Sequence, residues 1–354
     1  MEPADEGISL DEVGLATRNH GMPLEALRYD LTPAGLHYLL IHYDIPAVDA
    51  TSWRLEIGGD VDRPLELRLE ELHERPQVSR AVTLECAGNG RALMTPRAVS
   101  QPWLLEAVGN AEWAGTPLRG VLEEAGVREG AVEVLFTGMD RGVEADVEQE
   151  YERSLPLGEA MRDDVLLVYE MNGRPLLPQH GAPLRLIVPG WYGMTHVKWL
   201  GRIRVLTEPF EGYQHTRAYR WRTSEDDPGT PIERIRVRSL MVPPGIPHFL
   251  PRTRRVAAGT VELEGRAWSG HGRVTRVEVS VDGGGSWREA ELWPEAGTHA
   301  WRRWTATWDA TPGDNVLSCR ATDESGGTQP LEPDHNVGGY ANNAIQRVVV
   351  AVVP

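Results

Sequence analysis

Cys86 has the surroundings of a chemically active sulfur. It follows a strand-like run and begins the loop sequence CAGNGR at residues 86–91. The glycines of this loop let another group approach the backbone closely. The positive charge of Arg91 favours the thiolate, the form of cysteine that attacks electrophiles and binds metals. The loop therefore predicts a reactive or metal-binding sulfur. A buried cysteine beside a tight turn is the structural alternative, and it explains the same residues.

Two kinds of chemistry are open to this sulfur. A hydrolytic nucleophile would need a nearby histidine and an orienting acid, and none of the 11 histidines lies in a cysteine-hydrolase signature. A metal site would have one protein thiolate, since the second cysteine, Cys319, lies in a strand-like run and is predicted to be a buried apolar residue. A soft transition metal held mainly by an organic dithiolene would need only one thiolate. Two cysteines are too few for a disulfide framework or a four-cysteine metal site.

Three blocks of sequence carry a more specific signal than the cysteine loop alone. The first is the loop itself, and the second contains YEMNGRPL at 169–176, QHGAPLR at 179–185 and HVKWLG at 196–201. The third contains AWSG at 267–270, VSVDGG at 279–284 and RATD at 320–323. In consistent order over about residues 35–350, these blocks resemble the sulfite oxidase family of molybdopterin enzymes.

The resemblance implies a molybdenum-molybdopterin cofactor. Cys86 would ligate the metal through its sulfur, and the pterin dithiolene would add two more sulfurs; oxygen-atom transfer is the chemistry of this cofactor. The residues implied in holding the metal, the pterin and its terminal phosphate are Cys86, Asp140, His180, Arg185, His196, Val197 and Lys198. Arginine and lysine suit a phosphate, and a carboxylate such as Asp140 accepts the N–H donors of a ring.

The resemblance implies further residues on the substrate side. Tyr219 corresponds to a tyrosine beside the catalytic oxo group, where a phenol can form a hydrogen bond and help proton movement. Ala218 precedes it, where the family usually has aspartate. Arg91 and Trp103 correspond to an arginine and an indole wall of the substrate pocket.

Two positions depart from the anion-binding arginines of the family. His42 and Gly338 stand where arginines would be expected. Each lost charge-assisted hydrogen bond is worth ~1.5–3 kcal/mol, so we expect weak binding of plain sulfite or a different preferred substrate. A histidine at position 42 resembles the sulfane dehydrogenase branch of the family, which processes a protein-bound sulfur. We expect His42, when it is protonated at acid pH, to donate a hydrogen bond to an anionic substrate. The triplet Arg18-Asn19-His20 is interpreted as a segment on the cofactor side.

The elements that must position these residues divide the chain near residue 232. Strand-like runs at 80–84, 132–136, 165–169 and 184–188 accompany a helix-like run at 118–125, which is a mixed α/β pattern. The stretch at 225–231, with Pro and Gly, is typical of a linker. Beyond it we expect strands at 261–264, 277–281, 304–308, 316–321 and 345–353. We predict an α+β molybdopterin-binding domain at 1–232 and an all-β immunoglobulin-like sandwich at 233–354.

Composition restricts the partners. Apolar residues make up 41% and charged residues 25%, as in globular proteins, and a net charge of −16 argues against nucleic acid. No run approaches the roughly 20 apolar residues of a membrane span, so we expect no membrane partner. With no leader in view, we expect the cytoplasm, or the periplasm if a leader has been removed. The resemblance implies a homodimer through the sandwich. About 35 residues precede the resemblance, so we expect no haem and an external electron acceptor, either a cytochrome or dioxygen.

Three functions remain in view. Oxidation of sulfite or a related small sulfur compound on a molybdenum cofactor is favoured. Reduction of sulfoxides or other oxides on the same cofactor is a second enzymatic interpretation. The third is a metal-free scaffold or binding protein of this fold. Metal analysis separates the third from the enzymes, and assays in both directions separate the enzymes from each other.

Overall fold

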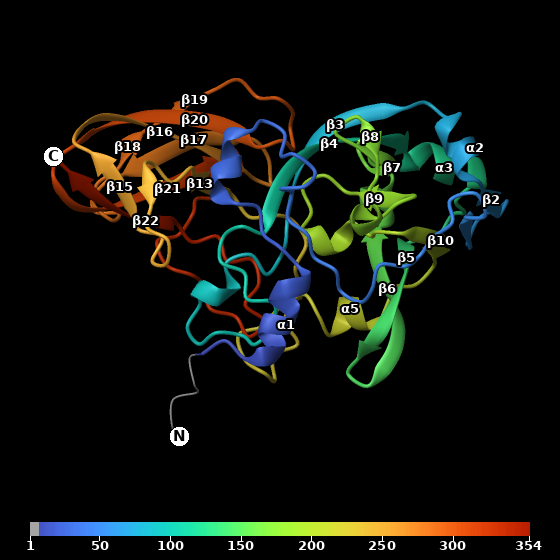
Figure 1. Ribbon diagram of the computed structural model, residues 1–354. Coiled ribbons are helices and arrows are strands. Elements are labelled where there is room, and N and C mark those ends of the chain that lie inside the picture. Colours follow the sequence, from blue (N-terminus) through green and yellow to red (C-terminus); the bar gives the residue numbers. More distant parts are fainter. Residues whose placement is uncertain (1–6) are drawn as a thin grey trace.

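The computed structural model describes residues 7–354, with a helix-containing region at one end and a β-sandwich at the other (Figure 1). The helices are α1 (Leu10–Arg18), α2 (Leu69–His73), α3 (Leu118–Ala125), α4 (Leu157–Ala160) and α5 (Tyr213–Thr216). Short 3-10 helices are η1 (Leu24–Arg28), η2 (Arg91–Leu93), η3 (Pro178–His180) and η4 (Gly193–Thr195). None of the helices in residues 7–354 has both the length and the apolar composition needed to cross a membrane.

Two sheets build the helix-containing region. The first has the order β2-β1-β10-β5-β6 and consists of β1 (Leu55–Gly59), β2 (Leu65–Leu67), β5 (Glu133–Glu144), β6 (Val147–Pro156) and β10 (Leu200–Leu206). β1 and β10 run parallel, and the other neighbours run antiparallel. The second has the order β3-β4-β7-β8, with β9 also paired to β7. Its strands are β3 (Val78–Glu85), β4 (Val108–Pro117), β7 (Leu166–Met171), β8 (Arg174–Pro175) and β9 (Arg185–Ile187).

Helix α3 joins the core of this region through one apolar face. Leu118, Val121, Leu122 and Ala125 recur at the spacing of a single helix face, and all four are fully buried. The helix ends at Gly126, whose φ of 72° is a left-handed conformation that favours glycine. Strands of both sheets contribute to the same core. The predicted helix at 118–125 is thereby confirmed, and the predicted strands correspond to β3, β5, β7 and β9.

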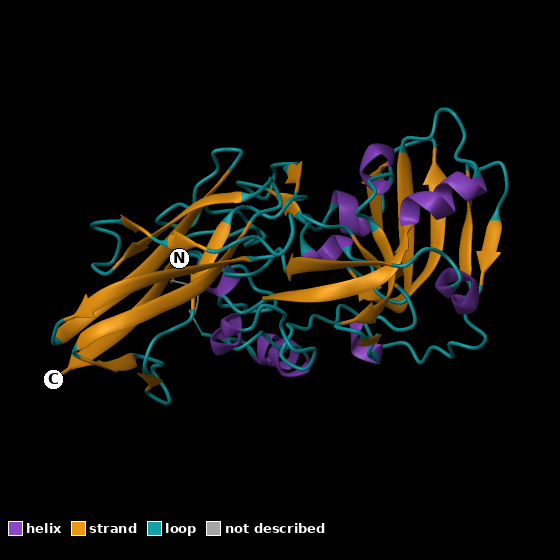
Figure 2. Ribbon diagram, turned by 90° about the horizontal axis from the view of Figure 1, so that it is seen from above, coloured by secondary structure: helices purple, strands orange, loops and turns teal. Residues whose placement is uncertain are grey.

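The sandwich consists of two facing sheets (Figure 2). One has the order β13-β16-β20-β19, with β13 (Arg238–Met241), β16 (Gly259–Trp268), β19 (Glu291–Leu292) and β20 (Arg302–Ala310). The other has the order β14-β15-β22-β21-β17-β18, with β14 (Ile246–Pro247), β15 (Arg254–Ala257), β17 (Val274–Ser280), β18 (Arg288–Glu289), β21 (Gly313–Asp323) and β22 (Gln346–Val353). A ribbon of β11 (Arg220–Trp221) and β12 (Thr230–Pro231) precedes them.

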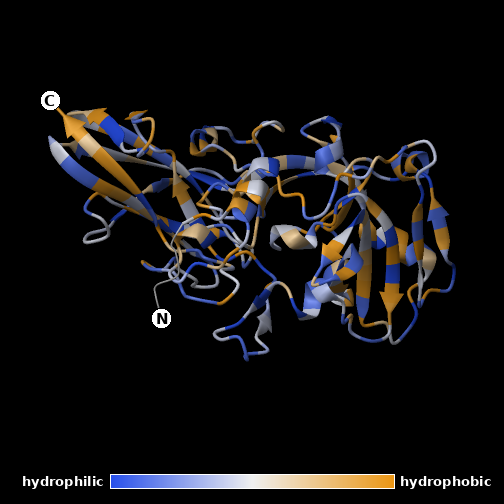
Figure 3. Cartoon of the chain, turned by 60° about the horizontal axis from the view of Figure 1, so that its bottom comes forward, coloured by the Kyte–Doolittle hydropathy of each residue, from blue (hydrophilic) through white to orange (hydrophobic). Residues whose placement is uncertain are grey.

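The core of the sandwich lies between its two sheets. Hydrophobic and hydrophilic residues alternate along the strands (Figure 3), and residues of both sheets form one apolar cluster. Cys319 is fully buried in it, as predicted. The expected all-β region is confirmed, whereas its immunoglobulin-like character and the division at residue 232 stay predictions.

A third apolar cluster connects the two regions. It includes residues of the N-terminal segment, the cysteine loop and the sandwich, among them Met22, Leu27, Ala87, Tyr192, Leu240, Trp268 and Trp301. The loop that follows β3 therefore packs against the sandwich as well as against its own sheets.

Candidate active site

The loop after β3 holds Cys86 in a buried position. The Cys86 N–H donates to the carbonyl of Ala107 at 2.9 Å, and its carbonyl accepts from the N–H of Asn89 at 2.9 Å. Gly90, with φ of 89°, lets the chain turn into η2. Burial raises the pKa of the Cys86 thiol, and the charge of Arg91 opposes that rise. The predicted effect of Arg91 is present, but the effect of burial on the pKa is larger.

Glu85, next to Cys86, ties this loop to the sandwich. Its carboxylate accepts hydrogen bonds from Arg238 Nη1 at 2.6 Å, from Trp268 Nε1 at 2.7 Å and from Asn89 Nδ2 at 3.0 Å. The side chains of Glu85 and Arg238 are each 1% exposed. A buried carboxylate with three donors has little freedom to move. The sandwich thus fixes the position of the cysteine loop.

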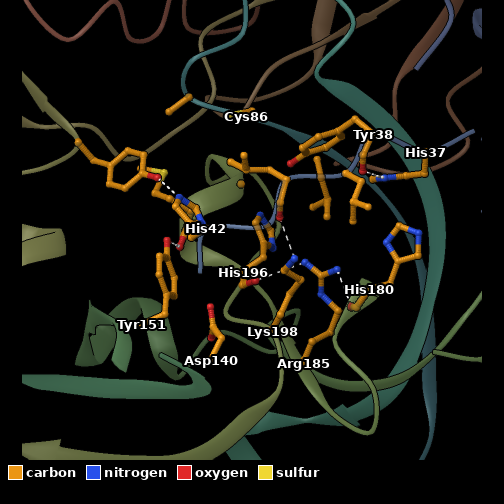
Figure 4. Close-up of a pocket in the computed structure, with 17 residues that line it drawn as sticks. His37, Tyr38, His42, Cys86, Asp140, Tyr151, His180, Arg185, His196 and Lys198 are labelled. Carbon is orange, nitrogen blue, oxygen red and sulfur yellow. Dashed lines mark hydrogen bonds between the residues drawn. The ribbon is translucent and has the colours of Figure 1, made fainter. Parts of the chain in front are cut away.

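A cavity, here called the basic cavity, lies beside Cys86 (Figure 4). It brings together eight of the predicted residues, namely His42, Cys86, Asp140, His180, Arg185, His196, Lys198 and Tyr219. Val197 does not line it, because its side chain is fully buried in the core of the helix-containing region. Sequence reasoning did not identify His37, Tyr38 and Tyr151, which also line the cavity.

Arg185 and Lys198 bring positive charge to the basic cavity without an ion pair to any carboxylate in residues 7–354. Arg185, 5% exposed, donates to the carbonyls of His180 at 3.0 Å and His196 at 3.3 Å. Lys198 Nζ donates to the carbonyl of Leu40 at 2.8 Å. Burial and, after it, the charge of the neighbouring Arg185 lower the pKa of Lys198 to about 7. An anion bound beside these groups would favour their charged forms.

The other polar groups of the basic cavity are neutral or unpaired. Burial raises the pKa of Asp140 to about 6, and its Oδ1 has no hydrogen-bond partner among the described residues. His196 accepts from the N–H of Val188 at Nδ1 and lies 3.0 Å from the carbonyl of Trp191 at Nε2. Burial lowers the pKa of both His180 and His196 to about 3, so both rings are neutral.

A second cavity, here called the aromatic cavity, meets the basic cavity at Cys86, His42 and Tyr219. The predicted substrate-side residues Arg91 and Trp103 both line it. Cys86 therefore stands between a cation-rich cavity and a cavity with aromatic walls. A group bound through the sulfur could be reached from the aromatic side.

The surroundings of Gly338 leave no room for a side chain at this position. Its carbonyl accepts from Arg91 Nε at 2.9 Å. A Cβ at residue 338 would lie 2.3 Å from the ring of Tyr340. Tyr340, which sequence reasoning did not identify, lies with its ring centroid 4.8 Å from Arg91 Cζ. The backbone at Gly338 holds Arg91, and Tyr340 fills the space that an arginine side chain would need.

His42 and Tyr219 form a hydrogen-bonded pair where the cavities meet. The Tyr219 hydroxyl bonds His42 Nε2, and the His42 ring stacks on Tyr151 with centroids 4.8 Å apart. Burial lowers the pKa of His42 to about 3, assisted by the charges of Lys198 and Arg153. This low pKa argues against the expectation that His42 becomes charged at acid pH, which stays a prediction. Tyr219 has φ of 51°, a strained conformation for a bulky residue and one that concentrates at functional sites.

Asn19 lies on the aromatic cavity, not on the cofactor side. Its Nδ2 donates to Gln101 Oε1 at 2.9 Å, and its Oδ1 accepts from the N–H of Ile41 at 2.7 Å. Arg18 donates to the carbonyl of Tyr43 at 2.7 Å. The interpretation of residues 18–20 as a cofactor-side segment is therefore wrong for Asn19, whereas His20 pairs through its backbone with Leu39, which lines the basic cavity.

Comparison with known proteins identifies the family. Residues 42–214 match the oxidoreductase molybdopterin binding domain, and residues 230–353 match the Mo-co oxidoreductase dimerisation domain. Sulfite oxidase of Gallus gallus is 35% identical over 340 residues, which cover 90% of this chain and 72% of that protein. The chain belongs to the sulfite oxidase family.

A second relative and a solved structure show how much of this chain is similar to known proteins. Mitochondrial sulfite oxidase of Rattus norvegicus is 37% identical over 347 residues, which cover 92% of this chain and 62% of that protein. The chain thus spans 62% of the length of that relative. The crystal structure of the sulfane dehydrogenase SoxCD from Paracoccus pantotrophus has a TM-score of 0.82 and 28% identity, covering 100% of this chain and 95% of that one.

The basic cavity fits the molybdopterin cofactor of the sulfite oxidase family. Arg185 and Lys198 are buried cations without an anion, and the cofactor carries a phosphate. Asp140 Oδ1 lacks a donor, and a pterin ring offers N–H groups. No group of three or more His, Cys, Asp or Glu within residues 7–354 could hold a metal ion. Cys86, which lines both cavities, would be a protein ligand of a metal bound mainly by the dithiolene.

Proposed function

We propose that this chain is a molybdenum-dependent oxidoreductase that oxidises sulfite or a related sulfur compound and passes the electrons to an external acceptor. The position of Cys86 carries the proposal, because the sulfur lines both the basic cavity and the cavity that holds Arg91 and Trp103. The bound cofactor would supply the oxygen-atom transfer chemistry. The sulfite oxidases and the sulfane dehydrogenase that this chain resembles support a sulfur-containing substrate.

The pair of Tyr219 and His42 can hold a proton beside the substrate. Burial raises the pKa of Tyr219 well above its usual value, so the phenol keeps its proton and can donate it to His42 Nε2. The imidazole accepts this hydrogen bond at Nε2 and, because burial lowers its pKa to about 3, stays neutral near pH 7. Ala218 leaves this pair without the neighbouring carboxylate that the family usually has.

Arg91 would orient an anionic substrate. It uses Nε and Nη1 for the carbonyls of Gly338 and Gln101, which leaves Nη2 for a substrate oxygen. Since His42 is neutral and Gly338 has no side chain, fewer cationic donors face the substrate than the family pattern contains. We therefore propose that free sulfite binds weakly, and that a sulfur group carried by a partner, as in the sulfane dehydrogenase branch, is the alternative substrate.

Metal analysis and turnover test this function together. The protein, expressed in a host that makes the cofactor, should contain about one molybdenum per chain and reduce an artificial electron acceptor in the presence of sulfite. Reduction of a sulfoxide with a reduced electron carrier, and no oxidation of sulfite, would favour the reverse reaction. A protein without molybdenum from a host in which a known family member is loaded would favour a scaffold role.

We also propose the assembly and surroundings of the enzyme. The match of residues 230–353 to a dimerisation domain supports a homodimer through the sandwich. A cytochrome or dioxygen would accept the electrons, and the chain itself would bind no haem. The absorption spectrum of the purified protein tests for haem, and cell fractionation tests the proposed cytoplasmic location.

A further inference from the structure

Arg153 is a buried guanidinium directly behind the wall of the aromatic cavity. It lies on β6 and is 2% exposed. Its Nη1 donates to the carbonyl of Gln214, and its Cζ lies 5.7 Å from the centroid of the Tyr219 ring. Gln214 and Tyr219 both line the aromatic cavity. The positive charge of Arg153 is therefore one side chain away from the place where a substrate would bind.

Arg153 has no carboxylate partner among residues 7–354, and its Nε has no hydrogen-bond partner there. Burial lowers the pKa of Arg153, while Tyr151, Tyr219 and Glu233 act in the opposite direction without forming an ion pair with it. An unpaired buried charge is strongly destabilising, so its presence at this position calls for a compensating ligand.

Among the buried arginines in the described part of the chain, those without a carboxylate partner are the ones close to Cys86. Six arginines are buried among the described residues, namely Arg91, Arg153, Arg185, Arg238, Arg254 and Arg266. The three whose guanidinium groups form ion pairs are Arg238 with Glu85, Arg254 with Glu25 and Arg266 with Asp30, and all three lie on sandwich strands. The three without a carboxylate are Arg91, Arg153 and Arg185, and all three lie on or directly behind the two cavities around Cys86.

The phosphate of a bound cofactor would be the anion that pairs with Arg185 in the basic cavity. Arg91 and Arg153 remain, and they flank the aromatic cavity at Tyr340 and at Tyr219. The one carboxylate among the described residues lining this cavity, Glu144, accepts hydrogen bonds from Gln214 Nε2 at 2.7 Å and from the Tyr43 hydroxyl at 3.1 Å. Glu144 forms no ion pair with either arginine among these residues.

We propose that Arg153 is a positioning residue for an anionic substrate. Its fixed charge lies behind Tyr219 and Gln214 and adds positive electrostatic potential to the aromatic cavity. His42, which is neutral, and Gly338, which has no side chain, do not supply this potential. The substrate class is then a sulfur oxyanion or a thiolate-derived anion, held against the Tyr219–His42 pair. The identity of the ligand as a sulfur compound rests on the proposed function. The role of Arg153 in anion binding does not, because its positive potential would attract any small oxyanion.

Binding of inorganic sulfate tests the charge of Arg153 without turnover. Molybdenum-loaded wild type, Arg153→Gln and Arg153→Lys are titrated with sulfate by calorimetry at low ionic strength. We expect Arg153→Gln to weaken sulfate binding at least about tenfold and Arg153→Lys to stay within about threefold of wild type, since lysine keeps the charge. Arg266→Gln is the matched control, because it removes a buried guanidinium from the sandwich and should leave sulfate binding unchanged.

Steady-state kinetics adds a second readout. With sulfite, Arg153→Gln should raise KM at least about tenfold and change kcat less than about threefold, as expected for lost attraction of the anion. Equal sulfate affinity of wild type and Arg153→Gln, or no sulfate binding by wild type, overturns the inference. If Arg153→Gln does not fold, Arg153→Lys decides alone, and a loss of sulfate affinity above about tenfold shows that the charge is not what matters. A wild type that binds sulfate through Arg153 but oxidises no sulfur compound would refute the proposed function and leave this inference standing.

Discussion

The two cysteines differ in chemical role because of what surrounds them. Cys86 lines both cavities, whereas Cys319 is fully buried in the core of the sandwich. We expect Cys86→Ser to lose most of the bound molybdenum and at least about a hundredfold in turnover, since even outer-shell changes at metal sites cost 10–100-fold. Cys319→Ser, the matched control, should keep its molybdenum and lose about 1–3 kcal/mol of stability. Equal molybdenum content in the two variants, measured by elemental analysis, would contradict this assignment.

The His42 ring should not act as a pH switch near neutrality. Because burial lowers its pKa to about 3, His42 is neutral above that value, and its protonation cannot strengthen anion binding between about pH 6 and pH 8. Sulfite is itself titrated in this range, so wild type and His42→Asn are compared at each pH. The ratio of their KM values should stay constant within about twofold. A ratio that grows steadily towards acid pH would show that His42 gains a charge.

Motifs revealed some site residues and missed others for a physical reason. Cys86, Arg185 and Lys198 belong to sequence blocks whose pattern is local, and the structure brings them to one cavity. Arg153 reaches the site because β6 pairs with β5. Tyr340 reaches it because the loop that carries it packs against Arg91. Such contacts join residues far apart in the chain, and no local spacing signals them.

The buried pair of Glu85 and Arg238 should be a major stabilising contact between the cysteine loop and the sandwich. Removing one partner leaves the other charge buried and unpaired, so Arg238→Met should cost about 3–5 kcal/mol in the free energy of unfolding. Arg119→Met removes an exposed ion pair on α3 and should cost at most about 1 kcal/mol. Urea denaturation compares them. A loss for Arg238→Met no larger than that for Arg119→Met would show that the pair does not hold the loop.

Elements with strong periodic patterns were predictable, and polar elements were not. Helix α3 was predicted because its four buried residues recur at helical spacing. Strand β6 was not, because it carries Glu148, Glu150 and Glu152, and acidic residues are depleted in strands. Its pairing with β5 overrides that local preference and places Tyr151 and Arg153 inside the molecule.

The whole molecule combines a strongly acidic chain with a locally positive site. The net charge is −16, yet the described residues around Cys86 include three buried arginines and Lys198 without carboxylate ion pairs. Composition could predict the excess of acidic residues but not this separation, which arises only when distant strands meet. The separation draws small anions inward while the surface as a whole repels phosphate backbones.

The sandwich exposes an apolar segment that suits contact with a second copy of the chain. Between β14 and β15, Phe249 is 87% exposed and Leu250 is 83% exposed. The adjoining residues 251–254 line a groove together with Leu93 and Leu104, which lie close to Arg91 in the chain. Two neighbouring large apolar side chains with this exposure form a candidate contact surface.

Replacing both side chains by charge tests this surface. Phe249→Asp with Leu250→Asp should convert the dimer into a monomer at micromolar concentration, because burying two carboxylates in an apolar interface is strongly unfavourable. Val143→Asp with Val147→Asp places the same charges on residues that are 69% and 59% exposed on the β5–β6 hairpin, and this variant should remain dimeric. Sedimentation velocity distinguishes the two states. A wild-type monomer, or a dimer that survives the first double substitution, would mean that this segment is not the interface.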